Sequence, residues 1–364
     1  MPDQATDETP RRPRRRRWWL WISAALVLTL GATAGVVATN YGNQPLGITD
    51  VQRATISEEA AAYLEDATTL TIPDVAVRYV ATEEVVRESQ QDFVAEETVV
   101  EDRLIDRFDL RLDQTVLAGV PVTVVTPPTV RPENANRIAI NVHGGGFVLG
   151  TSRDRVGLLM AQELGMPVYS VEYTLAPQAR YPVAVNEILA VYRALVTGRD
   201  PGQVVAFASS AGGNLLLSML LEAKKQGLPM IAGIALFTPC TDLTGVGDSV
   251  VANNGRDSLV TNIRVGVPEK FYAPGEDLKA PGLSPVYAEY PADFPATVLT
   301  TGTRDFNLSD ATRQFWKLDA AGVESRLLVG EGMWHGYHWE PDMPEAVQTR
   351  AAVVDFLLAQ LDPA

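Results

Sequence analysis

The sequence predicts an α/β fold in which helices cover both faces of a mainly parallel β-sheet. Short apolar runs that are typical of strands alternate with helical stretches through most of the chain. Strands of a parallel sheet are buried on both faces and joined by crossover helices, so they form nearly continuous hydrophobic runs. The runs are RIAINV (137–142), PVYSVEY (167–173), QVVAFA (203–208), IAGIALF (231–237), ATVLTTG (296–302) and ESRLLVG (324–330). The 364 residues, 46% of them hydrophobic, suffice for a sizeable core, and one domain around one sheet is the simplest expectation.

Charge is distributed unevenly along the chain. The net charge is −15, yet residues 1–20 carry six arginines against three acidic residues, a local +3, so the remainder carries about −18 (−15 minus +3). Nucleic acids bind proteins largely through neutralisation of phosphates by lysine and arginine, so an acidic body argues against such a partner. The single cysteine, Cys240, excludes an internal disulfide and is expected to be a small buried side chain.

The N-terminus combines a basic arm, residues 1–17, with an uncharged apolar segment, residues 18–39. At 1.5 Å per residue this segment is long enough to span the hydrocarbon core of a bilayer. Arginines before it and tryptophans at its start predict a transmembrane anchor with a cytoplasmic N-terminus and an extracytoplasmic body. The alternative is a signal peptide that is cleaved after the A-x-A sequence at residues 32–34. We favour the uncleaved anchor, and both interpretations export the body.

Local signals predict the elements that follow. Residues 40–54 are expected to form a linker, and a helix is predicted to begin after Ser57, whose hydroxyl can cap it. Another helix follows the run QVVAFA, with Gly227 placed to end it. A closing amphipathic helix is predicted over residues 345–361. The domain that contains the sheet is therefore expected to span residues 55–364.

The segment FASSAGG (207–213) carries the strongest chemical signal, because it lies where a buried strand turns into a helix. A nucleophilic serine at such a turn is strained and exposed, and it tolerates only small residues two positions before and after it. Ser210 has Ala208 and Gly212 at these positions. Ser209 would have a phenylalanine at one of them, so we predict Ser210 as the nucleophile. The alternative is an ordinary glycine-rich turn.

The segment HGGGF (143–147) follows the strand-like run RIAINV directly. Acyl transfer builds negative charge on a carbonyl oxygen, and a glycine run lets backbone N–H groups approach that oxygen without obstruction by side chains. Together with the N–H of Ala211, this loop would form an oxyanion hole. The alternatives are a phosphate-binding loop or a plain turn, but Leu149 occupies the final glycine position of a G-x-G-x-x-G motif.

The base and the acid follow from position in the chain. Of the three histidines, His143 belongs to the glycine loop, and His335 lies in a loop after ESRLLVG, at the strand end where open α/β sheets place their sites. His338 is expected to be a bystander, and the absence of an HExxH motif argues against a metal pair with His335. Asp305 follows ATVLTTG and precedes His335, as the chain order nucleophile, acid, base requires. Asp310 is expected inside the next helix.

These residues together resemble the hormone-sensitive-lipase-like branch of the α/β-hydrolases, a group of bacterial esterases and their relatives. The matching segments are HGGGF (143–147), EYTLAPQARYPVA (172–184), SSAGGN (209–214), TGTRDFNLSD (301–310) and EGMWHGY (331–337). The resemblance covers roughly residues 95–364. It implies an eight-stranded sheet with a helical cap formed by residues of about 55–100 and 242–285.

The resemblance also implies an activity, the hydrolysis of small-molecule esters without a cofactor or metal. The residues that it assigns to the site are Ser210, Asp305 and His335 for a catalytic triad and Gly144, Gly145, Gly146 and Ala211 for the oxyanion hole. Relatives usually have Gly-Asp before the nucleophile, whereas this chain has Ala208-Ser209. Amide, peptide or lactone hydrolysis, or a catalytically silent ligand-binding protein on the same fold, are the alternatives.

Overall fold

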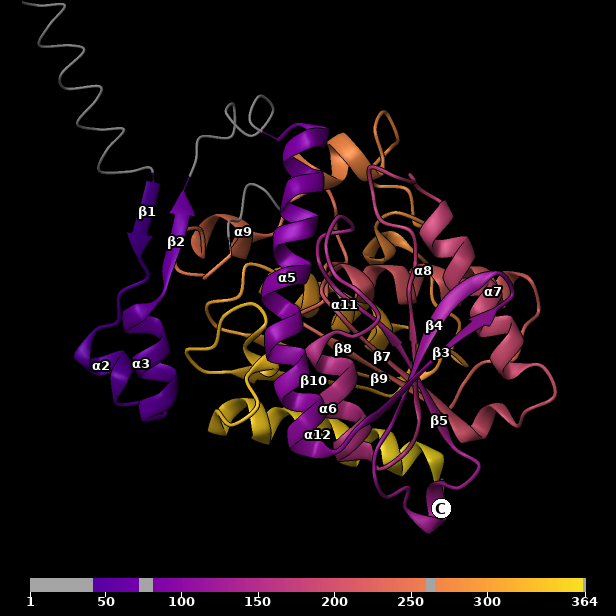
Figure 1. Ribbon diagram of the computed structural model, residues 1–364. Coiled ribbons are helices and arrows are strands. Elements are labelled where there is room, and N and C mark those ends of the chain that lie inside the picture. The colour runs from indigo at the N-terminus through magenta and orange to yellow at the C-terminus, as the bar shows by residue number, and fades with distance from the viewer. Residues whose placement is uncertain (1–41, 72–80, 260–265, 363–364) are drawn as a thin grey trace, which may run out of the picture. The chain divides into compact units, whose positions relative to one another are not determined.

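An eight-stranded sheet forms the centre of the protein (Figure 1). The computed structural model describes residues 42–71, 81–259 and 266–362. The strands are β3 (Arg111–Leu117), β4 (Val120–Thr126), β5 (Ile138–Val142), β6 (Val168–Val171), β7 (Val204–Ser209), β8 (Gly233–Phe237), β9 (Ala296–Gly302) and β10 (Ser325–Gly330). Their order is β10-β9-β8-β7-β5-β6-β4-β3, and the neighbours from β10 to β6 are parallel. The prediction of a mainly parallel sheet is confirmed, and each predicted run contains a strand.

An antiparallel hairpin, β3 and β4, completes one edge of the sheet, with β4 paired to β6. Its turn is formed by Ala118 and Gly119, both with positive φ, 50° and 86°. Two adjacent residues of positive φ match the right-handed twist of a two-residue hairpin. The sequence analysis did not predict these strands individually, because β4 alternates in burial and contains Pro121, unlike the continuous apolar runs of the parallel strands.

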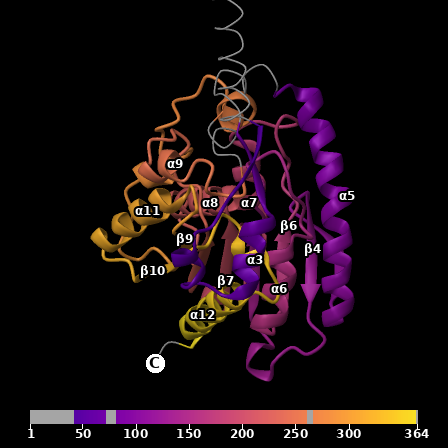
Figure 2. The same ribbon diagram turned by 90° about the vertical axis from the view of Figure 1, so that its left-hand side faces the viewer.

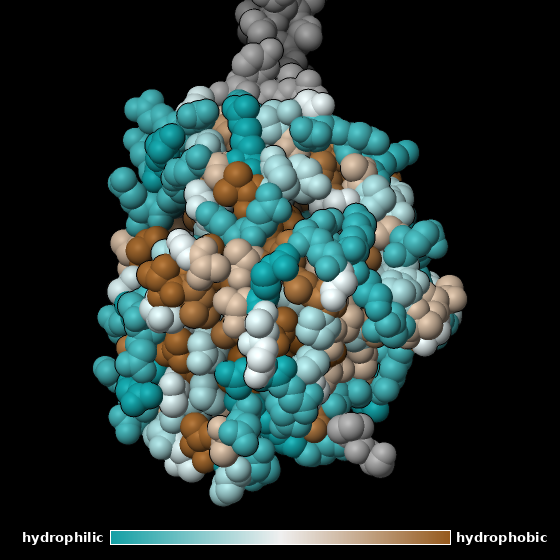
Figure 3. All heavy atoms as spheres, turned by 90° about the vertical axis from the view of Figure 1, so that its right-hand side faces the viewer, coloured by the Kyte–Doolittle hydropathy of each residue, from teal (hydrophilic) through white to brown (hydrophobic). Residues whose placement is uncertain are grey.

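Helices cover both faces of the sheet, as expected from strands that are buried on both sides. Alternate side chains of β7 enter two separate cores, with Ala206 in one and Phe207 in the other. The first core is covered by α7 (Val183–Val196), α8 (Ala211–Lys225) and α11 (Leu308–Ala320), and the second by α6 (Arg155–Leu164), α12 (Pro344–Leu361) and the C-terminal part of α5 (Glu83–Phe108). The outer face drawn in Figure 3 is largely hydrophilic, with apolar residues in smaller groups.

The N-terminal part of the described chain packs beside the loop that follows β10. The predicted helix after Ser57 is confirmed as α3 (Glu58–Asp66), and the hydroxyl of Ser57 accepts a hydrogen bond from the N–H of Ala60. Tyr63 of this helix stacks on Trp334 with ring centroids 4.0 Å apart. The predicted linker, residues 40–54, includes two short elements, β1 (Gly42–Pro45) and α2 (Asp50–Arg53); β1 pairs with β2 (Thr68–Thr71).

The segments predicted to form a helical cap differ in helix content (Figure 2). Within residues 55–100 lie α3 and the first part of α5. Within residues 242–285, the described part contains only the short helix α9 (Asp248–Ala252) and one π-helical turn, η3 (Pro268–Tyr272). Among the residues that the structure describes, no helix is long and apolar enough to cross a membrane. The predicted anchor, residues 18–39, lies outside these residues.

Candidate active site

Ser210 occupies a strained turn between β7 and α8. Its φ of 52° and ψ of −119° lie in a region that L-residues rarely adopt. The turn is held by backbone hydrogen bonds, because the N–H of Ser210 donates to the carbonyl of Phe237 at 2.9 Å and its own carbonyl accepts from Gly213 at 3.0 Å. Such a conformation persists only where surrounding structure enforces it, and it points the half-buried Ser210 side chain out of the sheet.

The need for small neighbours has a direct physical cause. A Cβ atom at Gly212 would lie 2.1 Å from the carbonyl oxygen of Val142, closer than atoms can approach. Phe207 is fully buried in the core beneath α6 and α12, so it could not flank an exposed nucleophile. Ser209 is 1% exposed. The geometry thus favours Ser210 over Ser209 for the reason that the sequence indicated.

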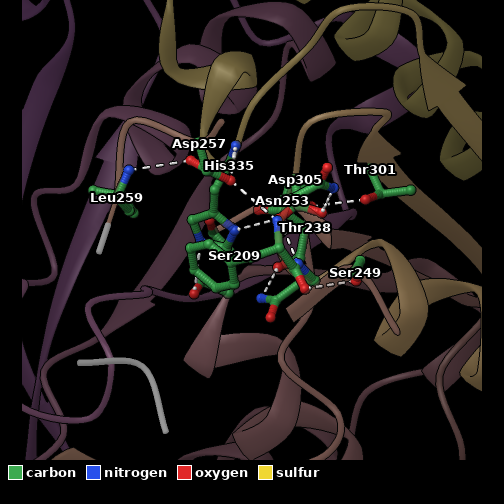
Figure 4. Close-up of polar contacts among 12 residues, drawn as sticks. Ser209, Thr238, Ser249, Asn253, Asp257, Leu259, Thr301, Asp305 and His335 are labelled. Atoms are coloured by element: carbon green, nitrogen blue, oxygen red, sulfur yellow. Dashed lines mark hydrogen bonds and ion pairs between the residues drawn. The ribbon is translucent and has the colours of Figure 1, made fainter. Parts of the chain in front are cut away.

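His335 lies between Ser210 and Asp305 and contacts both. Its Nε2 is 2.9 Å from the Ser210 hydroxyl oxygen. Its Nδ1 is 2.9 Å from Oδ1 of Asp305, and Figure 4 shows these two side chains. The imidazole is 2% exposed and stacks on Phe306 with ring centroids 4.5 Å apart. Both ring nitrogens are therefore occupied by the partners that the sequence predicted, and three residues far apart in the chain form one hydrogen-bonded series.

The Asp305 carboxylate is fully buried and held on several sides. Oδ1 accepts from the N–H of Asn307 at 2.8 Å, and Oδ2 accepts from the hydroxyl of Thr301 at 2.7 Å. These donors fix the orientation of the carboxylate toward the imidazole. Asp310 lies in α11, as predicted, where Oδ2 accepts from the N–H of Asp242 at 2.9 Å.

The glycine loop follows β5 and contains three consecutive residues of positive φ, Gly145 at 108°, Gly146 at 62° and Phe147 at 69°. A Cβ atom at Gly145 would lie 2.1 Å from the carbonyl oxygen of Leu149. His143 is fully buried at the start of the loop, stacked on a tyrosine ring, with Nδ1 2.8 Å from the carbonyl oxygen of Gly144. Burial lowers the pKa of His143, so this histidine is an uncharged part of the loop scaffold.

His338 has a specific contact that the sequence analysis did not predict. Its Nε2 lies 3.2 Å from the hydroxyl oxygen of Ser209, and its ring stacks on Phe237 with centroids 4.6 Å apart. Burial lowers the pKa of His338 well below its usual value, so the imidazole is uncharged at neutral pH. Ser209, the residue before Ser210, thus pairs with a neutral histidine. No local signal connects the two residues, which are 129 positions apart.

A cavity of about 330 Å³ opens onto Ser210 and His335. Its apolar lining consists of Phe93, Phe147, Val148, Leu149, Leu259, Val267, Pro268, Phe306 and Trp339. Charged side chains of α5 and α6 lie at another part of its wall, where Arg155 forms a 2.7 Å ion pair with Glu97. Burial raises the pKa of Glu101 in the same wall to about 7. An apolar cavity with a few polar groups beside a reactive side chain is typical of a small-molecule site.

Comparison with known proteins defines the class of this enzyme. A family model described as the alpha/beta hydrolase fold matches residues 139–339, more than half of the chain. The chain therefore belongs to the α/β-hydrolase fold family. Within this family it is a bacterial esterase of the hormone-sensitive-lipase-like group, a carboxylic ester hydrolase, as its relatives and structural neighbours show.

Two relatives illustrate the match in sequence. The chain is 33% identical over 253 residues to LipR of Mycobacterium tuberculosis, assigned as an acetyl-hydrolase, covering 67% of this chain and 78% of the relative. It is 31% identical over 232 residues to an esterase of Acinetobacter venetianus, covering 61% and 75%.

Solved structures show the same similarity in fold. The crystal structure of an esterase named E25 aligns with a TM-score of 0.78 at 27% identity, covering 86% of this chain and 97% of the other. An esterase from the bacterial hormone-sensitive lipase family aligns with a TM-score of 0.69 at 28% identity, covering 79% and 96%.

The prediction that the glycine loop forms an oxyanion hole implies that Gly145→Ala lowers kcat for a chromogenic acetate ester by roughly a hundredfold or more. The added Cβ cannot fit against Leu149, so the loop must move. Gly119→Ala in the β3–β4 turn is the matched control, because φ is also positive, 86°, but no atom lies within 4 Å of the added Cβ. The control should retain activity while losing about 1 kcal/mol of stability. Equal losses of activity in the two variants would contradict the role of the loop.

Proposed function

We propose that this esterase cleaves its substrate through an acyl-enzyme formed on Ser210, with His335 as the base and Asp305 as the acid of a catalytic triad. The observation that carries the proposal is the pair of 2.9 Å hydrogen bonds made by the two ring nitrogens of His335. A serine hydroxyl is a weak nucleophile unless an adjacent base takes its proton, and a base of this kind needs a third group to orient it.

The reaction proceeds in two steps at this site. His335 takes the hydroxyl proton through Nε2 while the Ser210 oxygen attacks the ester carbonyl, and it then gives the proton to the leaving alcohol. Asp305 holds the proton on Nδ1 and stabilises the imidazolium. Backbone N–H groups of Gly145, Gly146 and Ala211 stabilise the oxyanion, with Gly144 as a further candidate. Water then hydrolyses the acyl-enzyme with the same base.

The cavity supports a small ester as substrate. Its volume, about 330 Å³, lies near the lower end of the range for small-molecule pockets. Its wall near Ser210 is apolar, which suits a short acyl group and the apolar part of an alcohol. The acetyl-hydrolase assignment of a relative agrees with a short acyl chain.

The substitution Ser210→Ala is expected to abolish ester hydrolysis, whereas Ser209→Ala should retain most of it, because Ser209 is buried and directed at His338. A serine-reactive phosphonate should form its covalent adduct on Ser210, as mapped by mass spectrometry of the digested protein. Full activity of the Ser210 variant, or an adduct on Ser209, would refute the assignment of the nucleophile.

The members of the triad are expected to act as one unit. His335→Ala should cost nearly as much activity as Ser210→Ala, and the double variant little more, because each change removes the same stabilisation. Asp305→Asn should lower kcat by roughly 10²- to 10⁴-fold through loss of the correct tautomer. The controls Asp310→Asn and His338→Ala should lower kcat by less than about tenfold per folded molecule, since Asp310 accepts from the N–H of Asp242 and His338 contacts the buried Ser209. An inactive Asp310 variant beside an active Asp305 variant would reassign the acid.

We further propose that the body of the enzyme lies outside the cytoplasm. The support is the arginine-rich arm before the uncharged segment, residues 18–39. Protease added to intact spheroplasts should digest the body and spare the arm. A body that stays protected until the membrane is lysed would rule this orientation out.

A further inference from the structure

A second buried aspartate lies beside the base. Asp257 is 0% exposed, and its carboxylate accepts three backbone hydrogen bonds (Figure 4). Oδ2 accepts from the N–H of His335 at 3.0 Å and of Phe306 at 3.1 Å, and Oδ1 accepts from the N–H of Leu259 at 3.1 Å. One side chain thus joins the loop of the base, the loop of the acid and the segment that enters the cavity wall.

The bond to Leu259 alone is a local Asx turn, which asparagine or serine could also make. The other two bonds are different, because they come from loops that follow separate strands, β9 and β10. Only an ionised carboxylate has two oxygens that both accept without donating. A purely local role for Asp257 therefore leaves the bonds from Phe306 and His335 unexplained.

The segment around Asp257 also supports the acid loop from outside. The side-chain amide of Asn253 donates to the carbonyls of Thr303 at 3.2 Å and Asp305 at 2.9 Å. The guanidinium of Arg304 donates in return to the carbonyl of Arg256 at 2.9 Å. Residues 253–259 are thus hydrogen-bonded to the loop that carries Asp305. A change at Asp257 would therefore affect both this loop and the loop that carries His335.

Electrostatics adds a second effect to this geometry. Burial raises the pKa of Asp257 to about 7, while the charge of His335 acts in the opposite direction. The carboxylate is therefore charged above this pH, where it can stabilise the positive charge that the imidazole of His335 gains when it takes the serine proton. Among the described residues, the other titratable groups near this pair include Asp305, Arg304 and Arg256 from the adjoining loops, Tyr63 from α3 and His338, which burial keeps uncharged.

We propose that Asp257 is a positioning residue for the hydrolysis, one that fixes the backbone of His335 against Phe306 and supplies a second negative charge for the imidazolium formed during acylation. This inference rests on the proposed triad. His335 then contacts two buried carboxylates, Asp305 through its ring Nδ1 and Asp257 through its backbone N–H. Asp305 sets the tautomer of the ring, and Asp257 fixes the position of the backbone that carries the ring.

The test is the pH dependence of kcat/KM for a chromogenic acetate ester between about pH 5 and pH 8, where histidine titrates. Asp257→Asn removes the charge with little change in size, and Asp257→Glu keeps the charge but displaces it. The matched control is Asp242→Asn, since Asp242 is also 0% exposed and its carboxylate accepts from Arg313 and Tyr287. Ser210→Ala is measured in parallel.

In Asp257→Asn the acidic limb of the profile should move to lower pH by less than about one unit, because Asp257 itself loses its charge below a pH of about 7. On the plateau, where Asp257 is charged, kcat/KM should fall about tenfold, the change in rate that corresponds to one pKa unit of lost interaction. Asp257→Glu should lower the rate but leave the limb in place, and Asp242→Asn should leave the limb in place. A change confined to packing would lower rate or stability without moving the limb.

An unmoved limb in a folded Asp257→Asn enzyme would overturn the inference, and so would a limb in Asp257→Glu that moves by about a unit. If circular dichroism shows that Asp257→Asn does not fold, the pH profile of Asp257→Glu is the test. A limb that stays in place supports the inference, and a limb that moves by about a unit overturns it. Hydrolysis that survives Ser210→Ala would reject the proposed triad itself. An inactive Ser210 variant beside an unmoved limb would reject only the role of Asp257.

Discussion

The geometry of the site depends on how closely backbone segments approach one another beneath the nucleophile. A Cβ atom at Gly212 would lie 2.1 Å from the carbonyl oxygen of Val142, and one at Gly144 would lie 3.0 Å from that of Ser209. The first turn of α8 is therefore pressed against the end of β5 and the start of the glycine loop. Without this approach, the strained turn at Ser210 and the loop proposed to bind the oxyanion would stand too far apart to act on one carbonyl group.

A similar approach brings the acid and the base together. The parallel register pairs Gly302 at the end of β9 with Gly330 at the end of β10, so the two loops leave the sheet side by side. A Cβ atom at Gly302 would lie 2.1 Å from the carbonyl oxygen of Met333. The N–H of Arg304 donates to the same carbonyl at 2.9 Å. Sheet register and a missing side chain thus place the Asp305 and His335 loops within hydrogen-bonding reach.

The parts that the sequence could predict are those in which a local pattern reflects a local constraint. Continuous apolar runs indicated the parallel strands, and the small residues around Ser210 indicated the turn, because both follow from sterics within a few residues. The contacts of Asp257 and His338 could not be predicted in this way. Each joins residues about 80 to 130 positions apart, and a lone buried aspartate or histidine has no spacing that indicates its partner. Phe93 contributes to the cavity for the same non-local reason, through the packing of α5.

The three histidines lie in environments that differ in a way that bears on the proposed base. His143 and His338 are fully buried among aromatic rings, and burial lowers the pKa of each, so both rings are uncharged at neutral pH. His335 is almost as deeply buried, but its ring Nδ1 contacts the carboxylate of Asp305 and its backbone N–H contacts that of Asp257. A base must be able to gain a proton inside the site and release it again. His335 is also the histidine whose ring lies within 2.9 Å of the Ser210 hydroxyl, which supports its proposed role as the base.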